Sequence, residues 1–137
     1  MTEAPEIDVV TLGRSSVDLY GQQIGGRLED MASFAKAVGG SPTNIAVGAA
    51  RLGLHAGLIT RVGDEAFGRF IREQLEREGV DTRSVITDPS RLTALAIVGV
   101  RDDHSFLSSS TVRTALTWRF APRISTRPPS PAPVPWC

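Results

Sequence analysis

The 25 residues from Gly39 to Gly63, GGSPTNIAVGAARLGLHAGLITRVG, constrain the fold of this chain more than any other segment. After two glycines, Ser41 suits a helix N-cap and Pro42 suits the first helical position. Gly53 then provides a C-terminal stop for the predicted helix. The residues expected on the buried face of that helix are Ile45, Ala46, Ala49 and Leu52. An apolar strand follows at 58–62, so the segment predicts a small-residue helix packed closely against a sheet.

Strands and helices alternate around this segment. Further strands are predicted at 7–12, 85–87 and 93–100, and a second helix opens at Asp64 and Glu65. The apolar stripe of that helix is formed by Phe67, Phe70, Ile71 and Leu75. Residues 31–38 fit both helical spacing and strand alternation, and the glycines that follow favour extended structure. The alternating order predicts an α/β layered fold with a parallel sheet.

Composition excludes several classes of protein. Lys plus Arg and Asp plus Glu each total 15, so the formal net charge is zero and no clustered basic face indicates a nucleic-acid partner. The single cysteine, Cys137, rules out an internal disulfide framework. The acidic N-terminus has no signal-peptide core, and no apolar run approaches the ~18 residues of a membrane span. We therefore expect a cytoplasmic protein with no membrane partner.

Four residues are candidates for binding a small polar ligand: Asp18, Gly39, Gly40 and Asn44. Paired glycines let the backbone pass close to a ligand and adopt positive φ, and the helix start beside them offers free N–H groups. Asn44 can donate to and accept from hydroxyl groups, while the Asp18 carboxylate, expected beyond a strand end, can accept from a sugar diol. The same residues also fit a tight strand-to-helix turn with a surface asparagine and a turn aspartate.

No phosphate loop or metal site is predicted. The motif GxxxxGK[ST] is absent, and no GxGxxG stands in the right context. His55 and His104 lack partners at metal-ligand spacing, so both are expected to be ordinary loop or strand-edge residues.

Taken together, these residues resemble the first signature of the PfkB (ribokinase-like) carbohydrate kinases. The signature positions are Gly39, Gly40, Asn44, Ala46, Gly53 and Gly63, with no mismatch. Within the family, GR-x-x-VDLY and GGSP-x-N are most similar to kinases of the sugar acid 5-dehydro-2-deoxy-D-gluconate in inositol catabolism. Kinases of 2-keto-3-deoxygluconate, fructose or ribose share the same frame. The alternative function is not enzymatic: the chain would be a module that binds a sugar or a partner without catalysis.

The resemblance implies a Rossmann-like αβα domain with a small β lid. Asp18 would hold substrate hydroxyls, and Gly39, Gly40 and Asn44 would line the sugar site. Parts of 20–24 and 93–106 would supply lid strands, which pair two subunits in many relatives and so imply a homodimer. ATP and Mg²⁺ are the implied cofactors, and phosphoryl transfer depends mainly on positioning and charge stabilisation.

The chain departs from the family after Phe106. No Asp-Thr-x-Gly-Ala-Gly-Asp segment is present, so no catalytic residue can be assigned, and the family's general base, anion hole and most of its nucleotide site are missing. We expect residues 1–106 to be the N-terminal part of a kinase domain and the chain as written to be inactive. Six of the nine prolines lie between Pro122 and Pro135, so residues 107–137 are expected to be a non-native, disordered tail.

A shifted reading frame would explain this tail. Plausible codons for LSSSTVRTALTWRFAPRIST, read one base away, encode PLIFYRENCADMALCAEDID, which is similar to the family's continuation. The loss of one base after the Phe106 codon, by mutation or sequencing error, is the hypothesis that follows.

Overall fold

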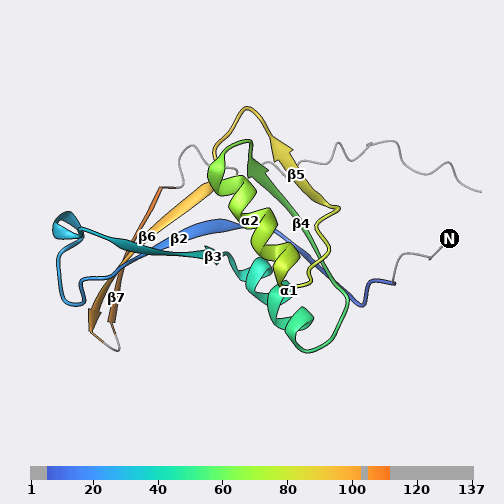
Figure 1. Ribbon diagram of the computed structural model, residues 1–137, viewed down its shortest axis with the longest axis horizontal. Helices are drawn as coiled ribbons and strands as arrows, with labels where there is room; N and C mark the ends of the chain where they lie inside the picture. The colour runs from blue at the N-terminus through green and yellow to red at the C-terminus, as the bar shows by residue number, and fades with distance from the viewer. Residues whose placement is uncertain (1–5, 103–104, 112–137) are drawn as a thin grey trace, which may run out of the picture.

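The computed structural model describes residues 6–102 and 105–111 of the chain. Their helices and strands form an α/β part, built on a three-stranded sheet, and a separate four-stranded sheet at one side of it (Figure 1). In chain order the elements are β1 (Val9–Leu12), β2 (Ser16–Gly21), the short 3-10 helix η1 (Leu28–Asp30), β3 (Phe34–Gly39), α1 (Ser41–Arg51), β4 (Ala56–Gly63), α2 (Ala66–Arg77), β5 (Val85–Asp88), β6 (Ala94–Asp102) and β7 (Ser105–Thr111).

The α/β part is built on a parallel sheet of order β1-β4-β5. Both α1 and α2 lie against the same face of this sheet (Figure 1). Between them and the sheet, the side chains of Leu58, Ile71 and Leu75 are fully buried and form the centre of the core. The predicted α/β class and the parallel pairing of its strands are confirmed. In the described residues, one layer of helices covers the parallel sheet.

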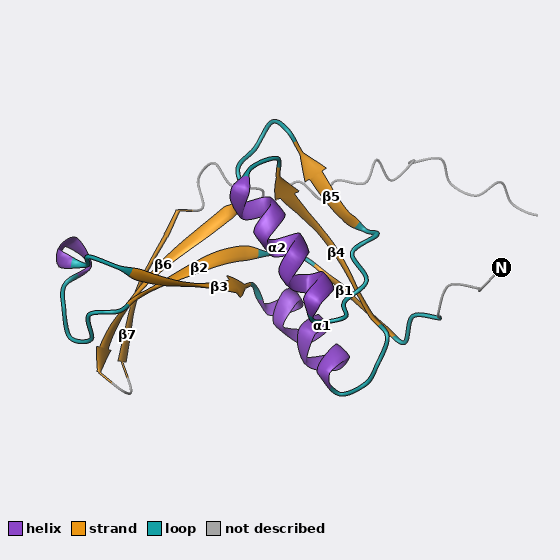
Figure 2. Ribbon diagram, viewed as in Figure 1, coloured by secondary structure: helices purple, strands orange, loops and turns teal. Residues whose placement is uncertain are grey.

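The second sheet, called the lid sheet below, has the order β3-β2-β6-β7 (Figure 2). Strand β2 runs antiparallel to β3 and parallel to β6, and β7 returns antiparallel along β6. The boundary predicted after Phe106 falls inside β7, whose pairing with β6 continues to Thr111. The rest of the predicted tail, residues 112–137, lies outside the described residues.

The start of α1 differs from the prediction. Ser41 lies inside the helix, and Gly40 is the N-cap, at φ +103° and without a side-chain cap. Glycine suits position 40 because the backbone there has a positive φ, which a serine in the same place would adopt only with strain. Gly53, at φ +90°, ends the helix as expected.

The buried face of α1 is also rotated from the expected one. Ile45 and Leu52 are 56% and 85% exposed, whereas Ala46 is fully buried. Thr43 is fully buried too, because its hydroxyl forms a 2.7 Å hydrogen bond with the Ser15 hydroxyl. Because this hydrogen bond satisfies the threonine hydroxyl, Thr43 can be buried against the sheet. The buried face of α1 therefore includes Thr43 and leaves Ile45 exposed.

A compact junction connects the α/β part to the lid sheet. The carboxylate of Glu65, the N-cap of α2, accepts hydrogen bonds from the backbone N–H groups of Phe67, Gly68 and Thr93. The Thr93 hydroxyl accepts from the N–H of Gly63. One carboxylate therefore fixes the start of α2 and the residue that precedes β6.

Candidate functional site

Asp18 lies in the middle of β2, between Ala37 of β3 and Ala96 of β6. This differs from the expectation that it follows a strand end. Polar Ser16 and Asp18 alternate with apolar Val17, a period-2 signal that sequence reasoning missed. The flanking alanines leave room around the carboxylate, and the Ser16 hydroxyl donates a 2.9 Å hydrogen bond to Asp18 Oδ1.

The paired glycines allow two close approaches. At Gly39 an added Cβ would fall inside the van der Waals radii of Asp18 Oδ1, Oδ2 and Cγ. At Gly40 it would meet the carbonyl oxygen of Arg14. The Asp18 carboxylate therefore rests directly on the backbone of Gly39, at the turn between β3 and α1, where only a glycine leaves it room.

The turn after β1 packs against the start of α1. Pro42 lies over Gly13, where an added Cβ would come within 2.7 Å of Pro42 Cγ. The buried bond between Ser15 and Thr43 ties the same two segments together. The turn after β1 and the start of α1 thus both pack beside the diglycine turn, and β2 brings the Asp18 carboxylate onto Gly39 of the same turn. Ser15 and Thr43 were not predicted, because neither hydroxyl has a distinctive sequence pattern.

Asn44 occupies the first turn of α1 and is exposed. Its backbone N–H donates to the Gly40 carbonyl at 2.9 Å. Its side chain borders a hollow of about 510 Å³ between β3, α1 and α2 that is lined partly by polar residues. That hollow is lined by Lys36, Ala37, Val38, Thr43, Asn44, Val47, Gly48, Arg51, Phe70, Gln74 and Glu78, and Asp18 is not among them. The structure therefore brings together Asp18, Gly39 and Gly40, with Asn44 one helical turn further on.

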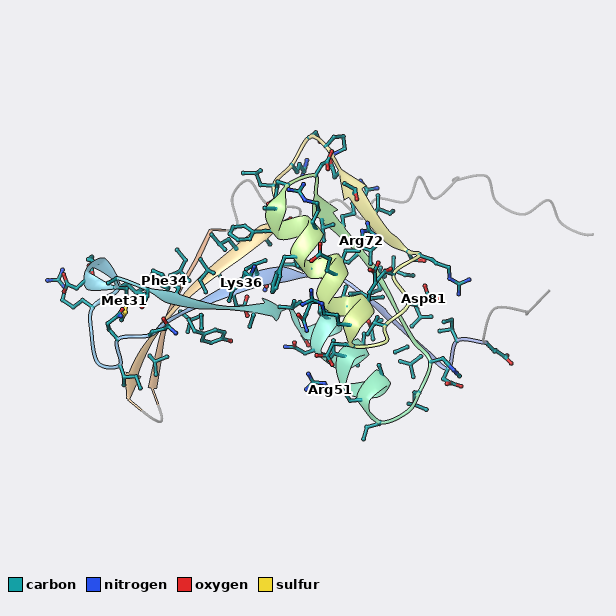
Figure 3. The ribbon with its side chains drawn as sticks, viewed as in Figure 1. Met31, Phe34, Lys36, Arg51, Arg72 and Asp81 are labelled. Atoms are coloured by element: carbon teal, nitrogen blue, oxygen red, sulfur yellow. The ribbon has the colours of Figure 1, made fainter. Side chains whose placement is uncertain are left out.

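Two cations that Figure 3 labels, Lys36 on β3 and Arg51 at the end of α1, border the same hollow. Each of them already has a partner. Lys36 Nζ lies 3.8 Å from the centre of the Phe70 ring. Arg51 Nε and Nη2 donate to the Glu78 carboxylate at 2.7 and 2.6 Å, joining the ends of α1 and α2. The hydrogen bond from Arg51 lowers the pKa of Glu78 from its ordinary value. The Glu78 carboxylate therefore offsets the positive charge of Arg51 at the edge of the hollow.

The Glu65 carboxylate at the junction is held in its charged form. Burial is the largest single influence and raises its pKa, but hydrogen bonds from Thr93, Phe67 and Gly68 together outweigh it. The net effect lowers the pKa of Glu65 from its ordinary value. Sequence reasoning placed Glu65 at a helix start but could not predict its bond to Thr93, 28 residues away.

No group of three His, Cys, Asp or Glu side chains within 6–102 and 105–111 could hold a metal ion. The sequence also lacks a phosphate loop and the Gly-Ala-Gly-Asp turn. In the same part of the chain, no helix is long and apolar enough to cross a membrane.

Comparison with known proteins assigns the family. The model of the pfkB family carbohydrate kinases matches residues 6–123, and this match continues beyond Phe106. The 5-dehydro-2-deoxygluconokinase of Geobacillus thermodenitrificans (strain NG80-2) is 44% identical over 100 residues, covering 72% of this chain and 30% of the relative. The enzyme of the same name from Bacillus subtilis (strain 168) is 43% identical over 86 residues, covering 63% of this chain and 26% of that relative.

Solved structures agree with this assignment. An uncharacterized sugar kinase from Pyrococcus horikoshii in complex with ATP has a TM-score of 0.73 at 33% identity, covering 79% of this chain and 35% of that one. The fructokinase of Halothermothrix orenii has a TM-score of 0.70 at 32% identity, covering 80% and 39%. The present chain spans about 30% of the length of its curated relatives. It belongs to the pfkB family of carbohydrate kinases.

Proposed function

We propose that this chain carries the sugar-binding part of an ATP-dependent carbohydrate kinase and that its ligand is a sugar acid, 5-dehydro-2-deoxy-D-gluconate. The observation that carries this proposal is the position of the Asp18 carboxylate on the backbone of Gly39. The names of the 44%- and 43%-identical relatives support the choice of ligand. Fructose is the second candidate, because a fructokinase is among the similar structures.

Each site residue has a physical role in this proposal. One oxygen of the Asp18 carboxylate accepts from Ser16, which leaves acceptor capacity for the hydroxyl groups of a polyol. Gly39 and Gly40 keep side chains away from the ring, and the uncapped start of α1 presents N–H groups to a polar substituent. Asn44 contributes a donor and an acceptor from the first turn of the same helix.

The described residues bind and orient but do not perform phosphoryl transfer. In the family, ATP with Mg²⁺ supplies the phosphoryl group and neutralises its developing charge. The sequence has no Gly-Ala-Gly-Asp turn that would deprotonate the sugar hydroxyl. We therefore expect residues 1–137 to bind the sugar without releasing ADP. Loss of a general base alone typically costs ~10²–10⁴ in rate.

Calorimetric titration of the purified chain with 5-dehydro-2-deoxy-D-gluconate tests the proposal. Hydrogen bonds to a charged group contribute about 1.5–3 kcal/mol, so Asp18→Asn should weaken binding about 10- to 100-fold. Asp30→Asn is the matched control, because Asp30 is a 68%-exposed carboxylate in η1, on the loop between β2 and β3. Equal affinity of the wild type and Asp18→Asn for the sugar would contradict the assignment of Asp18. Sugar-dependent release of ADP by the chain would contradict the expected inactivity.

The lid sheet is the proposed contact between two subunits. Strand β3 has one neighbour in the described sheet, β2, and so its other side is available for pairing. Light scattering during gel filtration would distinguish a dimer from a monomer, and a monomer at all concentrations would contradict this expectation.

A further inference from the structure

The loop between β1 and β2 contains a cation, Arg14, to which the proposed site gives no role. Its carbonyl oxygen is the atom that an added Cβ at Gly40 would meet, so the peptide group of Arg14 packs against the diglycine turn. The next residue, Ser15, is buried by its hydrogen bond with Thr43 in α1. The side chain of Arg14 is exposed. Arg14 is therefore held by its backbone at the edge of the candidate site, with its guanidinium accessible to a ligand.

Few cations belong to the segments that build this site. Residues 13–21 and 34–51 contain three of them, which are Arg14, Lys36 and Arg51. Lys36 pairs with Leu19 in the register of β3 and β2, whereas Ala37 pairs with Asp18. Because successive side chains of a strand point to opposite faces, Lys36 lies on the face of the lid sheet that is turned away from Asp18. Its Nζ lies over the Phe70 ring instead.

Arg51 is also removed from the site. It donates two hydrogen bonds to Glu78, and it lies about 15 Å along α1 from Ser41, at a rise of about 1.5 Å per residue. Arg14, by contrast, takes part in none of the ion pairs formed within residues 6–102 and 105–111. Of the three cations, Arg14 is the one that adjoins the diglycine turn and has no anionic partner there.

A sugar acid requires such a cation. It carries a carboxylate at one end of a chain of hydroxyl groups, and the Asp18 carboxylate repels a second negative charge. A guanidinium compensates this repulsion and can donate two parallel N–H bonds to one carboxylate. Lid-sheet residues on the face of Asp18 do not supply the charge, because its neighbours on β3 and β6 are Ala37 and Ala96.

We propose that Arg14 binds the carboxylate of the sugar acid and thereby selects an acid over a neutral sugar such as fructose. The proposal rests on the proposed function, in which Asp18 binds hydroxyl groups of the same ligand. Asp18 packs on Gly39 and the peptide group of Arg14 packs on Gly40, so the two binding groups adjoin neighbouring residues of one turn.

The test is calorimetric titration of the purified chain with two ligands: 5-dehydro-2-deoxy-D-gluconate and the neutral sugar in which a primary alcohol replaces its carboxylate. Arg14→Gln should weaken binding of the acid about 10- to 100-fold, the range for hydrogen bonds to a charged group, and leave the affinity for the neutral sugar unchanged. Added salt should weaken binding of the acid to the wild type but not to Arg14→Gln. Arg27→Gln is the matched control, because the Arg27 side chain is 73% exposed beside η1, away from the diglycine turn.

The neutral sugar separates a lost carboxylate contact from a damaged site. The role of Arg14 is overturned if Arg14→Gln binds the acid as tightly as the wild type, or if it weakens both ligands equally. Asp18→Asn should weaken both ligands, since both carry the hydroxyl groups. If Asp18→Asn does so and Arg14→Gln changes neither affinity, the proposed function stands and the role of Arg14 alone fails. If the wild type binds neither ligand, both proposals fail.

Discussion

Replacing Gly39 by alanine should displace the Asp18 carboxylate. The new Cβ would overlap Asp18 Cγ and both carboxylate oxygens, so either the aspartate side chain or the end of β3 must move by on the order of 1 Å. The aspartate is the easier group to move, since it is a side chain that rotates about its χ angles whereas β3 is hydrogen-bonded to β2 along its length. Rotation would break the hydrogen bond from Ser16.

The free-energy cost follows from what this rotation does to Asp18. Breaking a hydrogen bond to a charged group and leaving the side chain off its rotamer together cost about 2–4.5 kcal/mol, so Tm should fall by about 8 °C or more at roughly 4–8 °C per kcal/mol. Gly48→Ala is the matched control. Gly48 lies within α1, and beyond the backbone of that helix and its chain neighbours no atom of the described structure lies within 4 Å of an added Cβ, so this change should stabilise the chain by about 0.5–1 kcal/mol.

A double-mutant cycle isolates the Gly39–Asp18 contact. Urea denaturation gives the free energy of unfolding of the wild type, Gly39→Ala, Asp18→Ala and the double variant. In the Asp18→Ala background the overlap disappears, and Gly39→Ala should become neutral or stabilising. The reasoning is refuted if Gly39→Ala costs as much in that background as in the wild type, or if it costs nothing in either.

Three further predictions concern other parts of the chain. Hydrogen bonds lower the pKa of Glu65 in the folded state. The stabilisation by its carboxylate is therefore complete above the unfolded pKa of about 4.3 and is lost as pH falls through the lower folded pKa. Glu65→Gln should flatten the acid limb of a curve of unfolding free energy against pH, and an unchanged limb would contradict this. Thr60 Oγ1 is buried without a partner in the described structure, so Thr60→Val should leave the melting temperature unchanged or raise it, and a fall of several degrees would show that the hydroxyl is satisfied. Resequencing the gene across the Phe106 codon should reveal a PLIFYREN-like sequence one base out of frame; its absence would refute the shifted-frame hypothesis.

Much of the fold could be predicted because local signals agreed with one another. Gly53 stops α1 in a left-handed conformation that glycine adopts without strain, and the stripe of α2 buries Ile71 and Leu75 as its spacing predicts. The extended interpretation of residues 31–38 is confirmed for 34–38, which lie in β3. These features depend on residues close in sequence, which is why they could be recognised without a structure.

Long-range contacts decided the rest. The buried face of α1 depends on a hydroxyl pair between Ser15 and Thr43, and no periodicity of apolar residues reveals it. The position of Asp18 within β2 depends on strand pairing on both sides. Asp18 and Gly39 were predicted as site residues separately, but only the structure shows that the carboxylate of one rests on the backbone of the other.

A two-dimensional ¹H–¹⁵N NMR titration of chain 1–137 with 5-dehydro-2-deoxy-D-gluconate tests the central claim most directly, because it reports on each backbone amide at the site. If the carboxylate of Asp18 and the turn into α1 bind one sugar, the amide signals of Asp18, Gly39, Gly40 and Asn44 should shift together with a single Kd, and those of the Glu65 junction should not. Shifts confined to residues distant from the diglycine turn, or no saturable shifts at all, would contradict the account.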